Sequence, residues 1–266
     1  MTLHQVPVAN KDKVIIVGAG IGGLASSLRL SHLGYDVKVI ERANSAGGKL
    51  RTITGSTGEI DIGPTVLTLL PIFQKLFKSV GEDIFEHVDL VRQKIIARHW
   101  WPDGTSLDLY DDFETSRDAI MKFSGSSSAI EFEKYFCDTR DLFACFDLPV
   151  IQNPRPSILD MNRAVLSNPK ILPKMHPLRT LSSLLNYKFQ DIRLRQLFGR
   201  YATYVGGSPL ESPALLSLVW QAEAQGVWSI KGGMRKLARV IEPVSYTHLR
   251  AHETRGNIVC RLLLEK

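Results

Sequence analysis

The 266-residue sequence lacks most features that mark secreted, metal-binding or membrane-spanning proteins. It has three cysteines whose spacings form neither a disulfide framework nor a zinc pattern, so a reducing compartment is expected. No apolar run reaches the ~18 residues of a membrane span, and residues 1–13 contain no apolar segment typical of a secretory signal. The sequence therefore predicts a cytoplasmic globular protein without a metal site. The cysteines are Cys137, Cys145 and Cys260.

Charge and composition exclude further classes of protein. Lys and Arg number 33 against 27 Asp and Glu, and the net charge of +6 is too small to indicate nucleic-acid binding. A hydrophobic content of 44% is normal for a folded domain, and the 20 glycines and 13 prolines follow no period, which excludes collagen-like and low-complexity chains.

The last residues, 244–266, resemble translated sequencing-adapter DNA. The run VSYTHLRAHET back-translates to a transposase adapter arm, and VCRLLLEK follows as the other end of such an adapter after an index-sized gap. We therefore expect the native sequence to stop near Glu242, within a domain, and we exclude the tail from every site argument.

A strand, a glycine turn and a helix are expected in that order near the amino terminus. Lys13 to Val17 is a β-branched run, residues 18–23 read GAGIGG, and a helical pattern follows over 24–33. In such a unit the glycines permit a tight turn, close approach of the backbone to a diphosphate, and close helix packing. The phosphates then lie at the helix N-terminus. The predicted binding residues are Gly18, Gly20, Ile21, Gly22 and Gly23.

A second strand, residues 36–40, ends at Glu41. A carboxylate at that point is suited to bind ribose hydroxyls and would repel a 2′-phosphate. FAD or NAD is therefore favoured over NADP.

A second glycine segment follows, with Arg42, then AGGKLRT over 46–52 and DIGPT over 61–65. These motifs resemble the amine-oxidase and carotenoid-desaturase superfamily of flavoproteins. The resemblance implies FAD, with the phosphate and ribose channel lined by Arg42, Gly47, Gly48 and Lys49 and the flavin ring approached by Gly63, Pro64 and Thr65. Lys49 and Arg51 offer cationic hydrogen bonds to phosphate or flavin oxygens, the alternative being solvated loop cations.

The middle of the chain predicts a hairpin within 92–110 around Pro102-Asp103-Gly104, followed by a block of helices. Helical patterns cover 113–123, 129–146, 178–189, 191–204 and 213–224, with proline-broken connections at 149–156 and 169–177. The expected fold class is α/β: a Rossmann-like FAD-binding domain with an inserted mixed α+β substrate domain, incomplete at the C-terminus. The expected boundaries are 13–90 for the first part of the FAD domain, 91–225 for the substrate domain and 226–243 for the truncated return.

Four longer segments resemble the bacterial acyclic-carotenoid desaturases, and within them the 1-hydroxycarotenoid 3,4-desaturase branch. They begin at Gly63, Ala97, Arg195 and Gly226. The resemblance implies C-3,4 desaturation of a 1-hydroxycarotenoid with hydride transfer to flavin N5; no catalytic residue is nominated. The family's C-terminal half, with a second glycine-rich flavin segment, is absent, so this chain by itself is expected to be inactive. The alternatives are phytoene desaturase, a non-catalytic lipid carrier like the Rab GDP-dissociation inhibitors, and a soluble amine oxidase.

Two further features bear on a carotenoid substrate. Aromatic residues are candidates for tunnel walls or for ordinary core: Trp100, Trp101, Tyr201, Tyr204, Trp220 and Trp228. His99 is either a catalytic acid or base or a histidine whose hydrogen bonds are satisfied within the fold.

Residues 161–190 contain no Asp or Glu but mix leucines with Arg163, Lys170, Lys174, Arg179 and Lys188. This mixture is typical of peripheral docking on an anionic inner or photosynthetic membrane, or of two solvated helices that pack their leucines inward.

Overall fold

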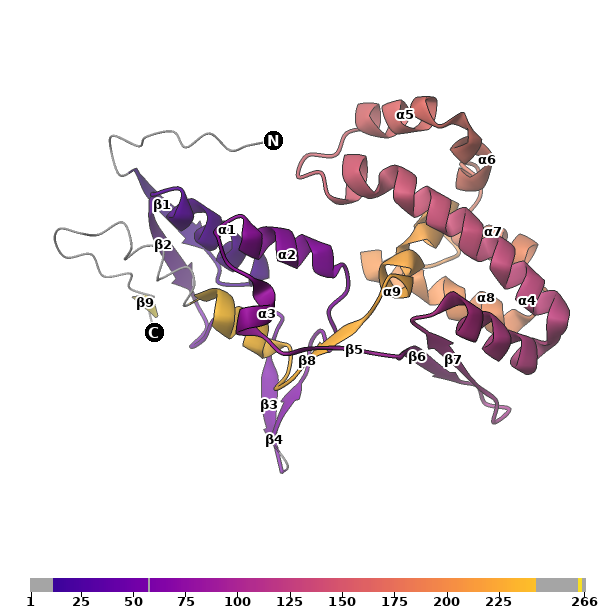
Figure 1. The fold of residues 1–266 in the computed structure, drawn as a ribbon, viewed down its shortest axis with the longest axis horizontal. Helices are drawn as coiled ribbons and strands as arrows, with labels where there is room; N and C mark the ends of the chain where they lie inside the picture. The colour runs from indigo at the N-terminus through magenta and orange to yellow at the C-terminus, as the bar shows by residue number, and fades with distance from the viewer. Residues whose placement is uncertain (1–11, 57, 243–262, 265–266) are drawn as a thin grey trace. The chain divides into compact units, whose positions relative to one another are not determined.

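The computed structural model describes residues 12–56, 58–242 and 263–264. The chain divides into two compact units (Figure 1). Unit 1 comprises the described residues of Met1–Arg92 and Trp228–Lys266, and unit 2 comprises Gln93–Val227. The adapter-like tail lies outside the described residues except for positions 263 and 264.

Unit 1 contains the expected β-α-β element. β1 (Lys13–Val17) pairs in parallel with β2 (Asp36–Glu41), and α1 (Ile21–His32) connects them. The short β9 (Leu263–Leu264) pairs in parallel with the end of β2, so the sheet order is β1-β2-β9. Leu24 and Leu28 of α1 are buried in one core with Val37 and Val39 of β2, which is why the helix covers the sheet.

The remaining elements of unit 1 come from residues 52–92 and from residues 228–242. β3 (Thr52–Gly55) and β4 (Gly58–Asp61) form an antiparallel ribbon, and α2 (Leu70–Lys78) and α3 (Ile84–His87) follow it. β5 (Leu90–Arg92) then pairs antiparallel with β8 (Trp228–Ile230), and residues 235–242 are helical. Leu237, Ala238 and Ile241 of this last helix are buried in the unit 1 core, so residues far apart in sequence complete one core.

Unit 2 is a hairpin followed by helices. β6 (Ile95–Trp100) and β7 (Ser106–Tyr110) pair antiparallel around the predicted Pro102-Asp103-Gly104 turn, which confirms the hairpin. The helices are α4 (Phe113–Phe146), α5 (Ile158–Ser167), α6 (Leu172–Met175), α7 (Leu181–Lys188), α8 (Ile192–Gly199) and α9 (Gln221–Ala224). Non-α helical segments are η1 (Asp147–Ile151), η2 (Pro169–Ile171), η3 (Arg200–Val205) and η4 (Ala214–Trp220).

An aromatic core holds unit 2 together. Phe132 contacts the rings of Phe113, Phe136, Phe198 and Trp220 at centroid separations of 5.8 to 6.2 Å. These side chains come from α4, α8 and η4, so aromatic packing joins elements distant in sequence.

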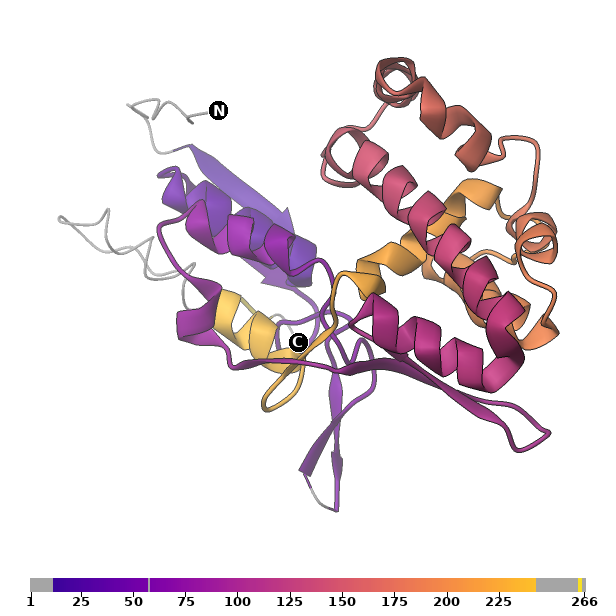
Figure 2. The same cartoon turned by 45° about the vertical axis from the view of Figure 1, so that its right-hand side comes forward.

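The two helices expected over 113–123 and 129–146 are confirmed as the two parts of α4, which is interrupted at Gly125, where φ is 89° and ψ is 172° (Figure 2). Other predicted helices differ in helix type. The patterns over 191–204 and 213–224 continue into 3₁₀ segments rather than remaining α-helical. The proline-broken connections also contain helical turns: Pro149 lies in a π-helical segment, and Pro169 and Pro173 occupy first-turn positions, where proline is tolerated.

Within the part of the chain that the structure describes, none of the helices combines the length and apolar character that crossing a membrane requires.

Candidate dinucleotide site and the helical unit

The turn between β1 and α1 is packed so closely that it has no space for a side chain at Gly23. A Cβ atom on Gly23 would lie 1.9 Å from the carbonyl oxygen of Gly18. Gly18 itself has φ +98° and donates its N–H to the carbonyl of Ile40, which ties the turn to β2. Gly22, in contrast, is exposed and has no atom within 4 Å of an added Cβ.

The N-terminus of α1 lacks a side-chain cap. Gly20 is the N-cap residue, makes no capping hydrogen bond, and no acidic residue lies in the first turn. Uncapped N–H groups and the helix dipole favour an anion at this position. The diphosphate of a dinucleotide fits this requirement.

The second glycine segment lies directly against the first. Gly20 and Gly47 form an isolated parallel bridge, and Gly47 donates its N–H to the carbonyl of Ala19 at 2.8 Å. Gly48 has φ +60°, and a Cβ there would lie 2.9 Å from the Cα of Gly20. The tertiary structure thus brings together two motifs that are 27 residues apart along the chain.

Glu41 lies at the end of β2 and is bound to the same turn. One carboxylate oxygen accepts from the backbone N–H of Ala43 at 2.9 Å and the other accepts from that of Ala19 at 2.7 Å. These hydrogen bonds, first from Ala43 and then from Ala19, lower the pKa of Glu41. Each oxygen retains a lone pair, so the carboxylate can accept from a ribose hydroxyl while it holds the turn.

The predicted cations differ in their contacts. Arg42, Lys49 and Arg51 are exposed, and Arg51 donates from Nε to the carbonyl of Gly48 at 2.9 Å. Arg51 therefore supports the backbone of the second glycine segment.

The predicted flavin-facing segment also lies near this loop. Gly63 packs so closely that a Cβ would lie 2.0 Å from the carbonyl oxygen of Lys49, and Gly63, Pro64 and Thr65 are exposed.

A contact not nominated from the sequence lies beside this segment. Asp61, at the end of β4, accepts from the backbone N–H of Met234 at 2.9 Å, and its other oxygen is buried without a hydrogen-bond partner among the described residues. Gly232 and Gly233 precede Met234 with φ +91° and +88°. This Gly-Gly pair was the sequence signal available for the contact.

The aromatic candidates divide between the two units. Tyr201 and Trp220 are buried core residues of unit 2, Trp101 packs against the same core, and Trp100 is exposed. Tyr204 is half-exposed, and Trp228 packs in unit 1. Tyr201 and Trp220 thus conform to the core interpretation.

His99 lies in β6 and stacks on Trp101 with centroids 6.1 Å apart. Burial, and then the charge of Arg200, lower the pKa of His99, so its ring is neutral at neutral pH. Its Nδ1 is buried without a hydrogen-bond partner among the described residues. The expectation of a fully satisfied histidine was therefore wrong.

Residues 161–190, which contain no Asp or Glu, do not form a uniformly exposed basic and apolar surface. Lys174 pairs with Asp138 and Asp141 of α4, and Lys188 pairs with Asp138 at 2.6 Å. These two lysines are thus partly neutralised by α4. Leu181, Leu184 and Leu185 are buried, whereas Leu166, Leu172 and Leu178 are exposed.

Within the described ranges, no group of three or more His, Cys, Asp or Glu side chains could hold a metal ion.

Comparison with known proteins identifies the class of protein first. Residues 16–82 match the NAD(P)-binding Rossmann-like domain family. A putrescine oxidase structure shares the fold at TM-score 0.57 and 17% identity, covering 90% of this chain and 50% of that one. A Rab GDI from Plasmodium falciparum shares it at TM-score 0.53 and 12% identity, covering 90% and 57%. The chain therefore shares its Rossmann-type fold with these structures, which confirms the predicted fold class.

Sequence relatives then show which proteins the chain is similar to over most of its length. The hydroxyneurosporene desaturase of Cereibacter sphaeroides is 44% identical over 226 residues, which are 85% of this chain and 46% of that protein. The Rhodobacter capsulatus protein of the same name is 42% identical over 89% of this chain and 48% of its own length. The chain is similar over most of its length to these carotenoid desaturases, as its motifs predicted, and spans about half the length of these relatives.

Proposed function

We propose that the complete protein containing this chain is an FAD-dependent oxidoreductase that desaturates an acyclic carotenoid, with a 1-hydroxylated carotenoid as its substrate and the C-3,4 bond as the site of reaction. The observation that carries the proposal is 44% identity to a hydroxyneurosporene desaturase along 85% of the chain. Phytoene desaturation is the second candidate for the same site.

The geometry of unit 1 fits FAD. The glycine-lined turn, the uncapped α1 N-terminus and the Glu41 carboxylate supply the groups that a diphosphate and an adjacent ribose require. The candidate binding residues are those predicted from the sequence, with Asp61 and the 232–234 loop as additional supports. We assign residues 13–90 and 226–243 to the cofactor domain and 91–225 to the substrate domain.

The chain's own residues would orient and enclose the reactants. When bound, a flavin supplies the two-electron acceptor that removal of hydrogen beside a polyene needs. The α1 N-terminus would hold the diphosphate, Glu41 would orient the ribose, and the exposed 63–65 backbone would contact the ring system. No side chain is assigned as a catalytic base.

The cofactor proposal can be tested at two glycines on either side of Ile21. A Cβ on Gly20 meets only the Cα of Gly48, at 3.9 Å, and a Cβ on Gly22 meets nothing within 4 Å, so both alanine variants should fold. We expect Gly20→Ala to weaken flavin binding at least tenfold, because its methyl group enters the diphosphate position, and Gly22→Ala to retain it. Absorbance in the flavin bands measures occupancy in the purified complete protein. Absence of flavin from the wild type would instead support a carrier of the GDP-dissociation-inhibitor type.

The substrate proposal is tested with the flavin-loaded protein. Incubation with 1-hydroxyneurosporene and, separately, with phytoene should give a red-shifted product only from the hydroxylated substrate. Reaction with phytoene alone would favour the second candidate, and oxidation of polar amines alone would indicate an amine oxidase.

We also propose that unit 2 docks on an anionic membrane surface, where a carotenoid is available. Leu166, Leu172 and Leu178 are 77%, 52% and 99% exposed, and Lys170 and Arg179 lie in the same stretch. α5 contains no buried residue and exposes Ile158 and Leu159. Apolar side chains with basic neighbours are typical of interfacial binding.

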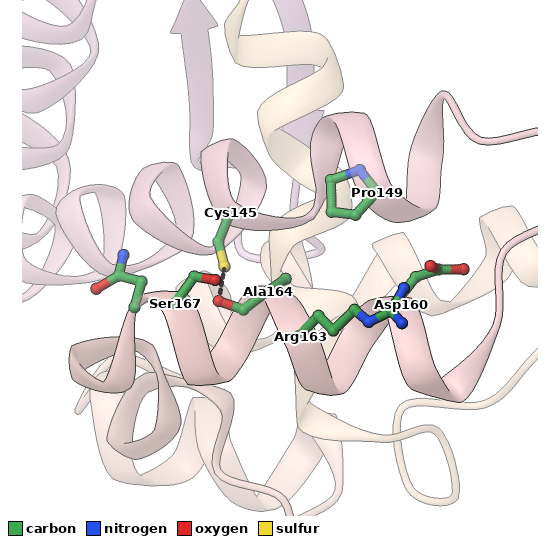
Figure 3. A pocket seen from close by; sticks show the side chains of 7 residues that line it. Cys145, Pro149, Asp160, Arg163, Ala164 and Ser167 are labelled. Atoms are coloured by element: carbon green, nitrogen blue, oxygen red, sulfur yellow. Dashed lines mark hydrogen bonds between the residues drawn. The ribbon is translucent and has the colours of Figure 1, made fainter.

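Residues of α5 also line a pocket with the end of α4 and η1. Figure 3 shows Asp160, Arg163 and Ser167 of α5 opposite Cys145 and Pro149, with the Cys145 thiol 3.8 Å from the carbonyl oxygen of Ala164. This contact attaches α5 to the end of α4, so the exposed leucines are the part available to a membrane.

Cosedimentation with phosphatidylglycerol vesicles tests the docking proposal. Leu166→Ser combined with Leu178→Ser should reduce binding, as should Lys170→Glu combined with Arg179→Glu. Lys174→Glu is unsuitable as a docking test because it would break the ion pairs with Asp138 and Asp141. Unchanged binding by both double variants would refute docking by this stretch.

A further inference from the structure

The turn between α6 and α7 presents a fully exposed leucine on a hydrogen-bonded backbone. Leu178 is 99% exposed. Before it, His176 ends α6 in the left-handed region, with φ 44° and ψ 58°, a conformation that costs free energy for a residue other than glycine. After it, Arg179 donates its N–H to the carbonyl of His176 at 2.9 Å, and its own carbonyl accepts from the N–H of Ala214 at 2.9 Å. The backbone around Leu178 is therefore held in place while its side chain faces solvent.

Arg179, the next residue, carries a positive charge that no carboxylate balances among the described residues. Its guanidinium lies over the ring of Tyr187, 4.6 Å from the centroid, and not against an acid. The charge of Asp138 reaches this neighbourhood, but Asp138 is already paired with Lys174 at 3.1 Å and with Lys188 at 2.6 Å. A guanidinium has only donors, so Arg179 can bind an anionic oxygen from outside the chain.

Tyr187, on α7, holds the guanidinium in place. Its ring is 65% exposed, lies under Arg179, and meets the ring of His176 edge-on with centroids 6.2 Å apart. Burial, and then the charge of Lys188, lower the pKa of His176, so that ring is uncharged at neutral pH. Arg179 therefore supplies the free charge of the turn. A tyrosine ring beside it is suited to the boundary between an apolar and an aqueous layer.

The two neighbouring side chains define the chemistry of a partner. Leu178 is covered favourably only by apolar groups, whereas Arg179, one residue further, requires an anionic oxygen. A lipid bilayer places hydrocarbon directly beneath a layer of phosphate groups, so it satisfies both side chains at once. Charge complementarity favours an anionic lipid, because residues 161–190 contain no Asp or Glu.

We propose that residues 176–179 anchor unit 2 in the membrane surface: Leu178 inserts among the acyl chains, Arg179 binds the phosphate of an anionic lipid through paired N–H donors, and Tyr187 positions the guanidinium. This inference rests on the proposed membrane docking and names the residues and the lipid group that carry it. A planar guanidinium matches two phosphate oxygens, which a lysine ammonium does not. The exposed Lys170 adds attraction to the surface without such a defined ligand.

Variants that conserve charge test the phosphate contact in the complete protein. Binding is measured by cosedimentation with phosphatidylcholine vesicles that contain phosphatidylglycerol. Arg179→Lys loses the paired donors and should lower the partition coefficient about threefold or more. Tyr187→Ser should lower it to a similar extent, whereas Tyr187→Phe keeps the ring and should bind like the wild type. Arg140→Lys is the control and should also bind like the wild type, because Arg140 lies over the ring of Phe136 at 5.9 Å but pairs with Asp141 at 3.7 Å.

A tryptophan at the exposed leucine tests insertion. On vesicle binding, the emission of Leu178→Trp should shift to shorter wavelength and be quenched by brominated acyl chains, measured as the difference from the wild type with its four tryptophans. Ile130→Trp is the matched control. Ile130 is 53% exposed on α4, but Glu131 and Glu133 are its neighbours, so an anionic surface should repel this position and its emission should not shift.

The outcomes separate this anchor from the docking proposal. Vesicle binding by the wild type, together with unshifted emission of Leu178→Trp or full binding by Arg179→Lys, would overturn the anchor while docking through other residues stands. Absence of vesicle binding by the wild type would overturn both. Inorganic phosphate at matched ionic strength should not displace the bound protein; displacement would assign Arg179 to a soluble phosphate and overturn the lipid contact.

Discussion

The two units of this chain are packed in opposite ways. In unit 1 the key turn depends on the absence of side chains, because Gly23 and Gly48 pack against backbone atoms of other residues. In unit 2 order depends on large side chains, because Phe132, Phe198 and Trp220 pack against one another from separate helices. The comparison shows that a phosphate-binding turn is specified by backbone geometry, whereas a helical unit is specified by volume and shape.

The β1 strand of unit 1 and the aromatic core of unit 2 also differ in how completely their apolar side chains are covered. On β1, Ile15 is 62% and Val17 is 84% exposed, and β1 pairs only with β2 among the described strands. The sheet of unit 1 therefore presents an open edge, a position at which a further strand can pair. In unit 2, by contrast, the aromatic cluster is closed around buried Tyr135 and Phe189.

The largest effect is expected from removing a ring at the centre of unit 2. Phe132→Ala should lower the free energy of unfolding by about 3–5 kcal/mol, because it deletes a fully buried ring that contacts four others. Denaturant unfolding measured by near-ultraviolet circular dichroism checks this. Phe85→Ala is the control, since Phe85 is 52% exposed, and equal losses in the two variants would contradict the central role of Phe132.

A somewhat smaller effect is expected from adding one methyl group to unit 1. Gly23→Ala should destabilise the β1-α1 turn by about 1–3 kcal/mol, because its Cβ would lie 1.9 Å from the Gly18 carbonyl oxygen. Hydrogen exchange of the α1 amides reports this locally. Gly22→Ala, one residue away in open space, should retain or slightly increase protection. Loss of protection in both variants would mean that the close approach of Gly23 to the Gly18 carbonyl oxygen does not decide the result.

The next effect concerns acid stability in unit 2. Asp191 accepts from Arg193 N at 2.8 Å as the N-cap of α8 and from Ser124 Oγ at 2.5 Å. The Arg193 side chain, as the first cause, lowers the pKa of Asp191 to about 2. A lowered folded-state pKa means that this stabilisation is present above pH 3.8, the ordinary value, and is lost as the pH falls towards 2.

Asp191→Ala should therefore cost about 1–2 kcal/mol at neutral pH through the lost cap. Asp191→Asn should keep the cap but lose much of the pH dependence between 4 and 2, in thermal melts followed across that range. An unchanged acid profile in Asp191→Asn would assign the acid sensitivity to other carboxylates.

The smallest effect is expected at the surface of unit 2. Leu178 is 99% exposed, so Leu178→Ser should change the free energy of unfolding by less than about 0.5 kcal/mol. Its buried counterpart Leu184→Ser, from the same leucine-rich stretch, should be strongly destabilising. Similar melting temperatures for the two variants would show that Leu184 is not more deeply buried than Leu178.

Much of unit 1 could be predicted from local sequence. The β1 and β2 runs, the glycine turn and the position of Glu41 follow from short-range patterns, and the observed strands have these bounds within one residue. The contact between Asp61 and Met234 could not be predicted in this way, because the two residues are 173 positions apart. In unit 2 the hairpin was recognisable from its turn, but the 3₁₀ character of η3 and η4 was not, since their apolar spacing also suits an α-helix.

By itself, the sequence determined the glycine turn between β1 and α1, because glycines at fixed spacing after a β-branched strand have few structural alternatives. Its longer motifs also predicted the similarity to carotenoid desaturases. The tertiary structure alone decided which polar side chains meet in the helical unit. Arg200, Glu223 and His99 come from η3, α9 and β6, and only packing of the aromatic core brings these side chains near one another. Side-chain contacts of this kind depend on long-range packing, which no local pattern encodes.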